Sequence, residues 1–172
     1  MSDKKATERL WTPWRMEYIL DNSKSAGCVF CSKPKEDDDR ANLILYRGKS
    51  FFVIMNRYPY NNGHLLITPY SHVGDMEDLS AEELCEITME MQRSIGILKK
   101  VMNPDGFNVG MNLGKAAGSG IDDHLHLHIV PRWKGDTNFM PVLSDVRVMP
   151  EHLDDTYMKL LDLYKEDSLK EE

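Results

Sequence analysis

Short apolar runs bounded by Gly, Pro or Asn alternate with polar segments along the chain. Their β-branched and aromatic side chains are typical of strands. A turn at residues 47–49 separates the first two runs, and a loop with three glycines at residues 114–120 separates the last two. Strands are predicted at residues 43–46, 51–55, 64–68, 107–113 and 124–130.

A helical pattern interrupts these strands. Ser80 and Glu83 have the spacing of a capping box, and Asn103-Pro104 marks the end of the helix that follows. Apolar residues of this long helix recur at spacings of three and four and predict one stripe that faces the core: Leu84, Ile87, Met91, Ile95, Leu98 and Val101 or Met102. A second helix is predicted at residues 151–164.

Strands on both sides of a long helix predict an α+β fold. We expect an antiparallel sheet of about five strands with the long helix packed on it and a C-terminal helical extension. Trp11, Trp14 and Tyr18 predict an aromatic arm that docks on the body or on a second subunit. Charged residues 35–40 are expected to form a solvated loop. The predicted organisation is an N-terminal arm at 1–26, one domain at 27–134 and an extension at 135–172.

Composition narrows the class of protein. The chain has 172 residues, enough for one domain, and hydrophobic residues make up an ordinary 41%. The longest apolar run, residues 51–55, is far below the ~20 residues of a membrane span. No apolar segment follows the charged N-terminus as in a secretion signal, so we expect a cytoplasmic protein. The net charge of −7 disfavours nucleic acid and anionic membranes as partners but leaves room for a small anionic ligand.

Three cysteines are too few for a disulfide framework. Cys28 and Cys31 form a C-x-x-C pair, which in a reducing compartment indicates half a zinc site or a redox pair. The redox interpretation needs a thioredoxin-like βαβ unit, which the pattern does not predict around the pair. Two buried thiols without further chemistry are the third alternative. Cys85, early in the long helix, is expected in the core.

The pattern His124-x-His126-x-His128 puts three imidazoles on one face of a strand and three aliphatic side chains on the other. Neighbouring histidines are expected roughly 7 Å apart. One rigid strand cannot bring all three around a tetrahedral ion, so the row suits successive parts of one ligand. Imidazole is a nucleophile toward phosphorus, and a glycine-rich loop offers N–H donors to phosphate. The pattern favours phosphoryl or nucleotidyl transfer over exposed or purely structural histidines.

The histidine row followed by Pro131-Arg132 resembles the histidine triad (HIT) superfamily of nucleotide hydrolases and transferases. Residues 61–72 resemble its upstream strand, and the C-x-x-C pair resembles the zinc motif of many bacterial members. The resemblance covers residues 27–134 and implies a HIT-like fold. Residues 11–15 and 131–150 are similar to the arm and tail of the diadenosine tetraphosphate phosphorylase-like branch.

The resemblance implies roles for the histidines. His126 is the expected nucleophile that attacks the α-phosphorus and forms a nucleotidyl-histidine, with His128 and His64 beside it. The resemblance also implies nucleotide- or phosphate-binding roles for other polar and glycine residues: Asn56 near the ribose, then Asn112, Gly118, Ser119 and Gly120, together with His128. Hydrolases of the family commonly carry Gln, and the phosphorylase branch Ser, at the position of Gly120; here the serine is Ser119.

In zinc-bearing members the first histidine of the triad is a metal ligand. The resemblance therefore implies a structural zinc held by Cys28, Cys31, His72 and His124. It implies cleavage of dinucleoside polyphosphates with phosphate as acceptor. The alternatives are a water-dependent hydrolase of nucleoside polyphosphates or AMP conjugates, and a nucleotide-binding scaffold with incidental turnover. A homodimer or a higher homo-oligomer is expected.

Overall fold

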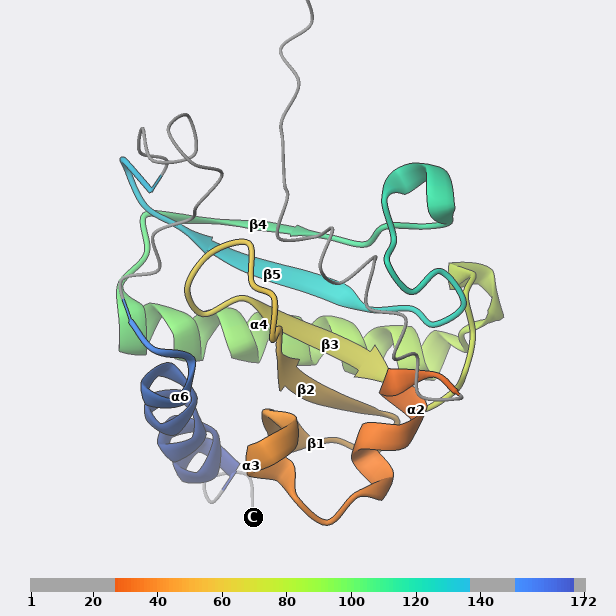
Figure 1. The fold of residues 1–172 in the computed structure, drawn as a ribbon, viewed down its shortest axis with the longest axis horizontal. Helices are drawn as coiled ribbons and strands as arrows, with labels where there is room; N and C mark the ends of the chain where they lie inside the picture. The colour runs from red at the N-terminus through yellow and green to blue at the C-terminus, as the bar shows by residue number, and fades with distance from the viewer. Residues whose placement is uncertain (1–26, 137–150, 169–172) are drawn as a thin grey trace, which may run out of the picture.

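The computed structural model describes residues 27–136 and 151–168. The predicted aromatic arm at residues 11–18 lies outside these ranges. The described residues form a five-stranded antiparallel sheet with strand order β1-β2-β3-β5-β4 (Figure 1), which confirms the predicted α+β class. The strands are β1 (Ile44–Arg47), β2 (Phe51–Met55), β3 (Leu65–Pro69), β4 (Gly106–Gly110) and β5 (Leu127–Arg132).

The centre of the sheet is its most buried part. Every residue of β2 and of β3 is buried, and the two strands pair along their whole lengths. β5 pairs with β3, so that His128 lies opposite Leu66, and with β4 on its other side. β5, which carries His128 of the predicted histidine row, is thus an internal strand with a neighbour on each side.

The strand ends differ from the prediction where the sheet meets the site. β4 ends earlier than predicted, at Gly110, which pairs with His128. β5 begins at Leu127, so His124 and His126 precede the strand. β5 also continues through Pro131, which pairs with Phe107 of β4. The pairing of β5 with β3 ends before this residue, at Ile129, so the missing N–H of Pro131 removes no hydrogen bond to β3.

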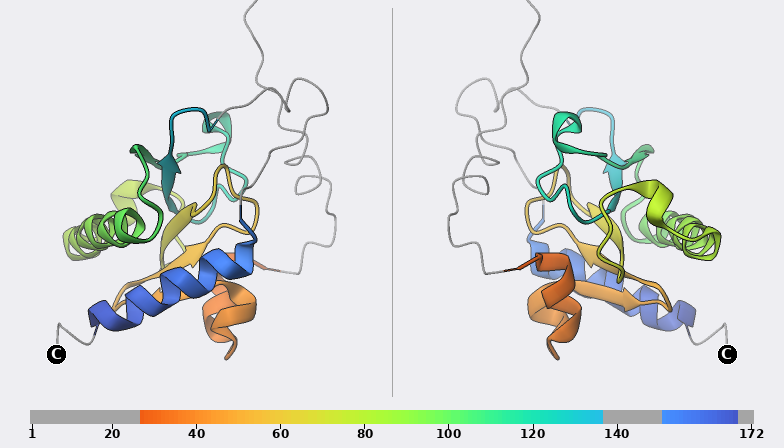
Figure 2. Two further views of the ribbon diagram at one scale, coloured as in Figure 1. Left: turned by 90° about the vertical axis from the view of Figure 1, so that its left-hand side faces the viewer. Right: turned by 90° about the vertical axis from the view of Figure 1, so that its right-hand side faces the viewer.

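The long helix, α4 (Ala81–Met102), crosses one face of the sheet and contacts β2, β3 and β5 (Figures 1 and 2). The predicted capping box is present. The Ser80 hydroxyl accepts a hydrogen bond from the backbone N–H of Glu83, and the Glu83 carboxylate accepts one from the backbone N–H of Ser80. Asn103, in the left-handed conformation with φ 45°, ends the helix where predicted.

The predicted apolar stripe of α4 faces the core. Ile87 and Leu98 are buried, and Leu84 packs against the same cluster. Cys85, however, is exposed, so the prediction of a core cysteine is wrong. One residue along a helix turns the side chain by about 100°, which carries Cys85 off the stripe that Leu84 belongs to.

The C-terminal helix, α6 (Leu153–Ser168), packs against β1 and α4. It is shifted toward the C-terminus from the predicted residues 151–164. The Tyr157 hydroxyl donates to the backbone oxygen of Ile44 at 2.9 Å, which fixes α6 to β1. Among the helices that the structure describes, none is long and apolar enough to cross a membrane. The cytoplasmic location stays a prediction.

Residues 35–40 are largely exposed, as their charge predicts, and residues 36–38 form a loop. The two ends of the run are helical, because it includes the end of a short 3₁₀ helix, η1 (Lys33–Lys35), and the start of α3 (Asp39–Asn42). The Asp38 carboxylate caps α3 by accepting the backbone N–H of Ala41 at 2.9 Å. The acidic run therefore begins a helix.

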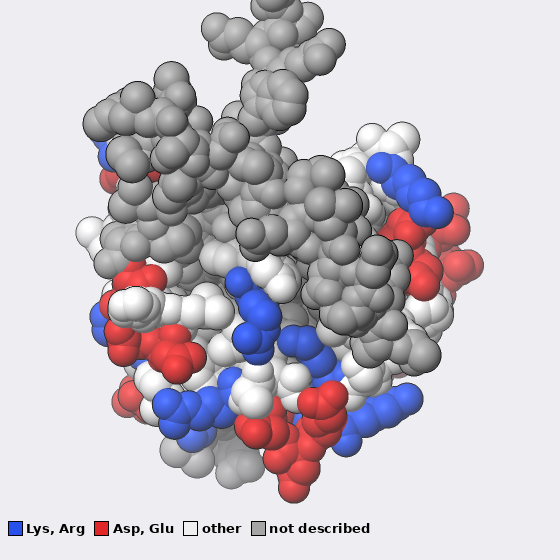
Figure 3. Space-filling model, in the orientation of Figure 1, with Lys and Arg blue, Asp and Glu red and all other residues white. Residues whose placement is uncertain are grey.

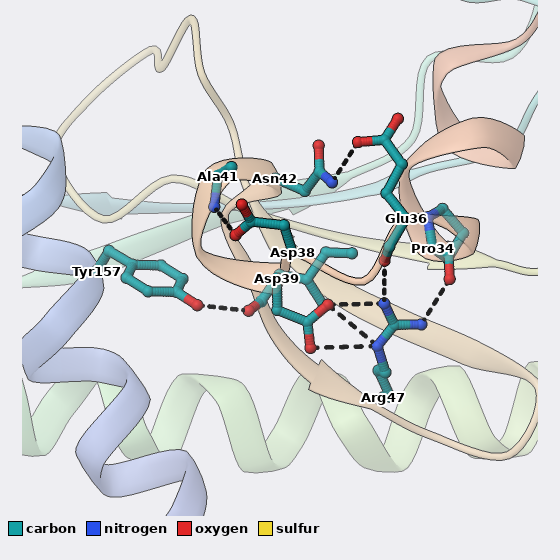
Figure 4. A network of polar contacts seen from close by, with 9 residues as sticks. Pro34, Glu36, Asp38, Asp39, Ala41, Asn42, Arg47 and Tyr157 are labelled. Carbon is teal, nitrogen blue, oxygen red and sulfur yellow. Dashed lines mark hydrogen bonds and ion pairs between the residues drawn. The ribbon is translucent and has the colours of Figure 1, made fainter.

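Arg47 of β1 fastens this segment to the sheet, as Figure 4 shows. Its guanidinium pairs with the Asp39 carboxylate at 2.7 Å and donates to the backbone oxygens of Pro34 at 2.8 Å and Glu36 at 3.5 Å. A planar group with five donors can hold three acceptors at once. The segment directly follows α2 (Val29–Ser32), so Arg47 also restrains the helix of the C-x-x-C pair.

Candidate active site and metal centre

Four side chains from three separate segments converge beside the sheet: Cys28, Cys31, His72 and His124. Their ligand atoms all lie within 4.8 Å of one another. The Sγ of Cys28 is 3.3 Å from Nδ1 of His124, and the Sγ of Cys31 is 3.3 Å from Nδ1 of His72. The two Nδ1 atoms are 3.2 Å apart. The four residues that the resemblance named are thus one cluster.

This geometry fits a tetrahedral zinc ion. Zn–S bonds of about 2.3 Å and Zn–N bonds of about 2.0 Å place S and N ligands about 3.5 Å apart and two N ligands about 3.3 Å apart. The observed separations of 3.2 to 3.5 Å match those edges. Two thiolates and two imidazoles are also the donor set of a closed structural site.

The hydrogen bonds of His124 direct the lone pair of its Nδ1 toward the cluster. Its Nε2 lies 2.9 Å from the backbone oxygen of Pro69, which can only accept, so Nε2 carries the proton and Nδ1 has the lone pair. Burial lowers the pKa of His124, which keeps the ring neutral as a metal ligand must be. Burial also raises the pKa of the Cys28 thiol, an effect that backbone N–H groups partly oppose.

His126 is held in one tautomer by the backbone oxygen of His124. Its Nδ1 lies 2.9 Å from the backbone oxygen of His124, so Nδ1 donates and Nε2 carries the lone pair. The ring is buried, and burial lowers the pKa of His126 below its ordinary value. A neutral imidazole with one free lone pair is a nucleophile at neutral pH.

His128 and His64 lie next to His126, the predicted nucleophile. The ring centroids of His126 and His128 are 4.9 Å apart, closer than the roughly 7 Å expected for strand neighbours. His126 lies before β5, so the regular strand spacing does not apply to it. Nε2 of His64 lies 2.9 Å from Nδ1 of His128, which couples β3 to β5 through the two rings. The structure therefore brings the three predicted catalytic histidines together.

Two aromatic residues that sequence reasoning missed frame these rings. Phe30, between the two cysteines, has its ring centroid 5.4 Å from that of His124 and 5.1 Å from that of His126. Tyr60 stacks on His64 at 4.8 Å and on His128 at 5.7 Å. Phe30 stands inside the C-x-x-C pair and Tyr60 directly before residues 61–72, but only the structure shows which rings they touch.

The predicted nucleotide-binding residues are placed unequally. The Asn56 side chain contacts the loop before β3 and His64. Asn112 follows the end of β4 and is partly exposed. In the glycine-rich loop, Gly118 has a left-handed φ of 86°, and the Ser119 hydroxyl donates to the backbone oxygen of Ile121 at 2.7 Å. The roles of these residues stay predictions.

Charge is mixed over the face that Figure 3 shows. There the described Lys and Arg side chains are interspersed with Asp and Glu and form no continuous basic surface. This agrees with the net charge of −7. The recognition of an anion on this face would rest on local donors rather than on a broad positive field.

Comparison with known proteins identifies the fold family. Residues 38–135 match the HIT domain, which covers more than half of the chain. The chain belongs to the HIT family. A Mycobacterium tuberculosis protein named AP-4-A phosphorylase is 41% identical over 87% of this chain and 80% of its own length. The family membership that the histidine pattern predicted is thereby confirmed.

Other HIT relatives extend the comparison. A Dictyostelium discoideum protein named bis(5'-adenosyl)-triphosphatase is 32% identical over 56% of this chain and 64% of its own length. The structure of a zinc-bound histidine triad protein from Mycobacterium smegmatis has a TM-score of 0.66 and 27% identity, over 83% of this chain and 97% of that protein. Its likeness to this chain confirms the HIT-like fold.

Proposed function

We propose that this chain is an enzyme that cleaves dinucleoside polyphosphates by nucleotidyl transfer through His126. The single observation that carries the proposal is the hydrogen bond from Nδ1 of His126 to the backbone oxygen of His124 at 2.9 Å. It leaves Nε2 of a neutral imidazole as the nucleophile, with His128 and His64 alongside. A protein that only binds nucleotides has no need of such a nucleophile.

The substrate class follows from the relatives. AP-4-A phosphorylase shares 41% identity over most of both chains, and the triphosphatase relative also acts, by its name, on a dinucleoside polyphosphate. We propose diadenosine tetraphosphate or a similar compound as the substrate and inorganic phosphate as the acceptor.

The reaction has two steps in this proposal. Nε2 of His126 attacks the α-phosphorus, a P–N bond forms, and the P–O bond to the leaving nucleotide breaks. The leaving oxygen keeps the electron pair and takes a proton from the site. Phosphate then attacks the same phosphorus and displaces His126. Diadenosine tetraphosphate plus phosphate gives ATP and ADP. Asn112, Gly118, Ser119 and Gly120 are the proposed phosphate contacts, together with His128. A ribose contact is the role that the resemblance implies for Asn56.

We further propose that the Cys28, Cys31, His72 and His124 cluster holds a structural zinc ion. The separations between its ligand atoms and its donor chemistry support this. When bound, the ion supplies a cross-link between α2 and the segment before β5. Four protein ligands leave no open position, so the site does not take part in the chemistry.

The proposed assembly is a homodimer or a higher homo-oligomer, with the aromatic arm at residues 1–26 packed on the domain or across subunits. The domain at 27–134 and the extension at 135–172 complete the proposed organisation. The HIT match ends at residue 135, which supports the proposed boundary between the domain and the extension.

One incubation tests the function. Labelled diadenosine tetraphosphate is mixed with the protein in the presence and absence of inorganic phosphate. The proposal expects ATP and ADP, and only when phosphate is present. ATP and AMP without phosphate would instead identify a water-dependent hydrolase. Tight binding with no product would identify a nucleotide-binding scaffold.

A further inference from the structure

We propose that Asn56 is a positioning residue that, together with the backbone N–H of Tyr60, fixes the tautomer of His64 and through it that of His128. The resemblance placed Asn56 near a ribose. In the structure its side chain is directed at His64. The catalytic consequence rests on the proposed function, whereas the tautomer itself does not.

The orientation of the Asn56 amide is decided by its neighbour. The backbone N–H of Tyr58 lies 2.9 Å from one side-chain atom of Asn56. A backbone N–H can only donate, so that atom is the oxygen, Oδ1. The other atom is therefore Nδ2, and it lies 3.3 Å from Nδ1 of His64. Asn56 presents a donor to the histidine.

A second donor reaches the same ring nitrogen. The backbone N–H of Tyr60 lies 3.0 Å from Nδ1 of His64. With two N–H groups directed at it, Nδ1 must accept, and the proton of the neutral ring is on Nε2. His64 is only 1% exposed, so bulk water cannot offer this nitrogen another arrangement.

The fixed proton on His64 then decides the state of the next ring. Nε2–H of His64 faces Nδ1 of His128 at 2.9 Å, so Nδ1 of His128 accepts and its own proton is on Nε2. His126 has the opposite arrangement, with the proton on Nδ1 and the lone pair on Nε2. The site thus pairs one nucleophilic nitrogen with one adjacent proton donor.

The backbone around this relay is rigid. The backbone N–H of Asn56 donates to the backbone oxygen of His64 at 2.9 Å, which closes the turn before β3. The Tyr60 ring stacks on His64 and on His128 and restricts both rings. The relay from Asn56 to His128 therefore has few other arrangements available.

Asn56→Asp tests the proposal because it replaces a donor with an acceptor of the same shape. We expect Nδ1 of His64 to gain a proton in this variant, and kcat to fall by about tenfold or more because His128 loses its fixed donor state. Asn56→Ala keeps the Tyr60 donor and should lower kcat less. A ribose contact would give the reverse order, since a carboxylate also accepts from ribose hydroxyls.

The first readout is long-range ¹H–¹⁵N NMR of the histidine rings in the protein without nucleotide. The wild type should show a protonated Nε2 and an unprotonated Nδ1 on His64, and Asn56→Asp should not. Gln92→Glu, the same exchange of an amide for a carboxylate at an exposed site on α4, is the matched control and should alter neither the spectrum nor kcat.

An unchanged His64 spectrum in Asn56→Asp would overturn the proposal, as would a higher KM with unchanged kcat. A wild-type His64 with its proton on Nδ1 would overturn it without any variant. Because the spectrum is recorded without substrate, it stands whether or not the chain cleaves dinucleoside polyphosphates. Failure of the positioning role and failure of the proposed function are therefore separate results.

Discussion

At the scale of single residues, His124 links two kinds of chemistry. Its ring offers Nδ1 to the metal cluster, its Nε2 donates to Pro69, and its backbone oxygen accepts from His126. One residue thus belongs to the proposed zinc site and fixes the tautomer of the proposed nucleophile. Phe30 adds a second link, because its ring touches the rings of both histidines.

Replacing His126 with Ala should abolish turnover. Removal of the nucleophile costs several powers of ten in rate, so we expect less than about one percent of wild-type activity. Nucleotide binding and the folded state should be retained. Steady-state assays with labelled substrate and a binding titration measure the two properties separately.

His152→Ala is the control, since this histidine is exposed and lies outside the site. It should keep wild-type activity. More than about one percent of activity in His126→Ala would show that another group is the nucleophile.

The histidine row stands out in the sequence by its period-two alternation, but only His128 lies in the strand that this alternation predicts, and His124 and His126 precede it. The grouping of His64, His72 and the two cysteines came from the resemblance. Contacts that depend on the conformation of a loop could not be predicted from the sequence. The direction of the Asn56 amide depends on a turn that returns the Tyr58 N–H to it, and no periodicity encodes that contact.

At the scale of elements, the short N-terminal helix α2 depends on tertiary contacts. A helix of four residues has little stability of its own. It is held by the C-x-x-C cluster at one end and, through the following segment, by Arg47. For the charged residues after α2 the sequence predicted only a loop, and it did not predict that Asp38 caps α3 or that Asp39 pairs with Arg47.

Zinc should copurify at about one ion per chain, since four ligands make one closed site. Cys31→Ser should lower the melting temperature more than it lowers kcat, because the ion ties α2 down and does not take part in the reaction. Metal analysis and thermal melts measure this. Cys85→Ser, at an exposed cysteine on α4, is the control and should change neither. Protein purified without chelator and found free of metal would contradict the zinc proposal.

The packing of α6 on α4 contains a buried polar cluster. The Tyr164 hydroxyl lies 2.6 Å from the Ser94 hydroxyl, which donates to the Glu90 carboxylate at 2.9 Å. The Arg93 guanidinium donates to the backbone oxygen of Tyr164 at 3.1 Å. Burial raises the pKa of Tyr164 far above its ordinary value, so the phenol stays neutral in the folded protein.

Tyr164 should make the protein less stable at alkaline pH. In the unfolded chain the phenol ionises near pH 10, whereas the folded state resists ionisation. The free energy of unfolding should therefore hold below about pH 10 and fall as the pH rises above it. Tyr164→Phe should lose about 1 kcal/mol at neutral pH and show a smaller alkaline decrease. Urea unfolding at neutral pH and at about pH 11 compares the two; equal alkaline decreases would contradict the argument.

At the scale of the whole molecule, the two edges of the sheet differ. β1, at one edge, is covered by contacts from α3 and α6. β4, at the other, has three exposed residues, and Val109 there is 41% exposed. Within the part of the chain that the structure describes, β4 pairs with a strand on one side only, and an edge strand with exposed apolar side chains favours pairing with another chain. The sequence predicted the α+β class and an antiparallel sheet of about five strands. It did not predict the order of the strands, because strand order depends on long-range pairing.

We therefore predict at least a dimer in solution, with the β4 edge as the expected contact. Light scattering on the intact protein measures its mass, and a variant lacking residues 1–20 tests the aromatic arm. Two indoles and a phenol buried at a subunit contact would contribute several kcal/mol at roughly 25 cal/mol per Å². Truncation should then weaken the assembly.

A second variant, Val109→Lys, places a charge on the exposed edge strand and should also shift the protein toward monomer. A monomeric intact protein would contradict the dimer, and an assembly unchanged by truncation would leave it to the sheet edge alone.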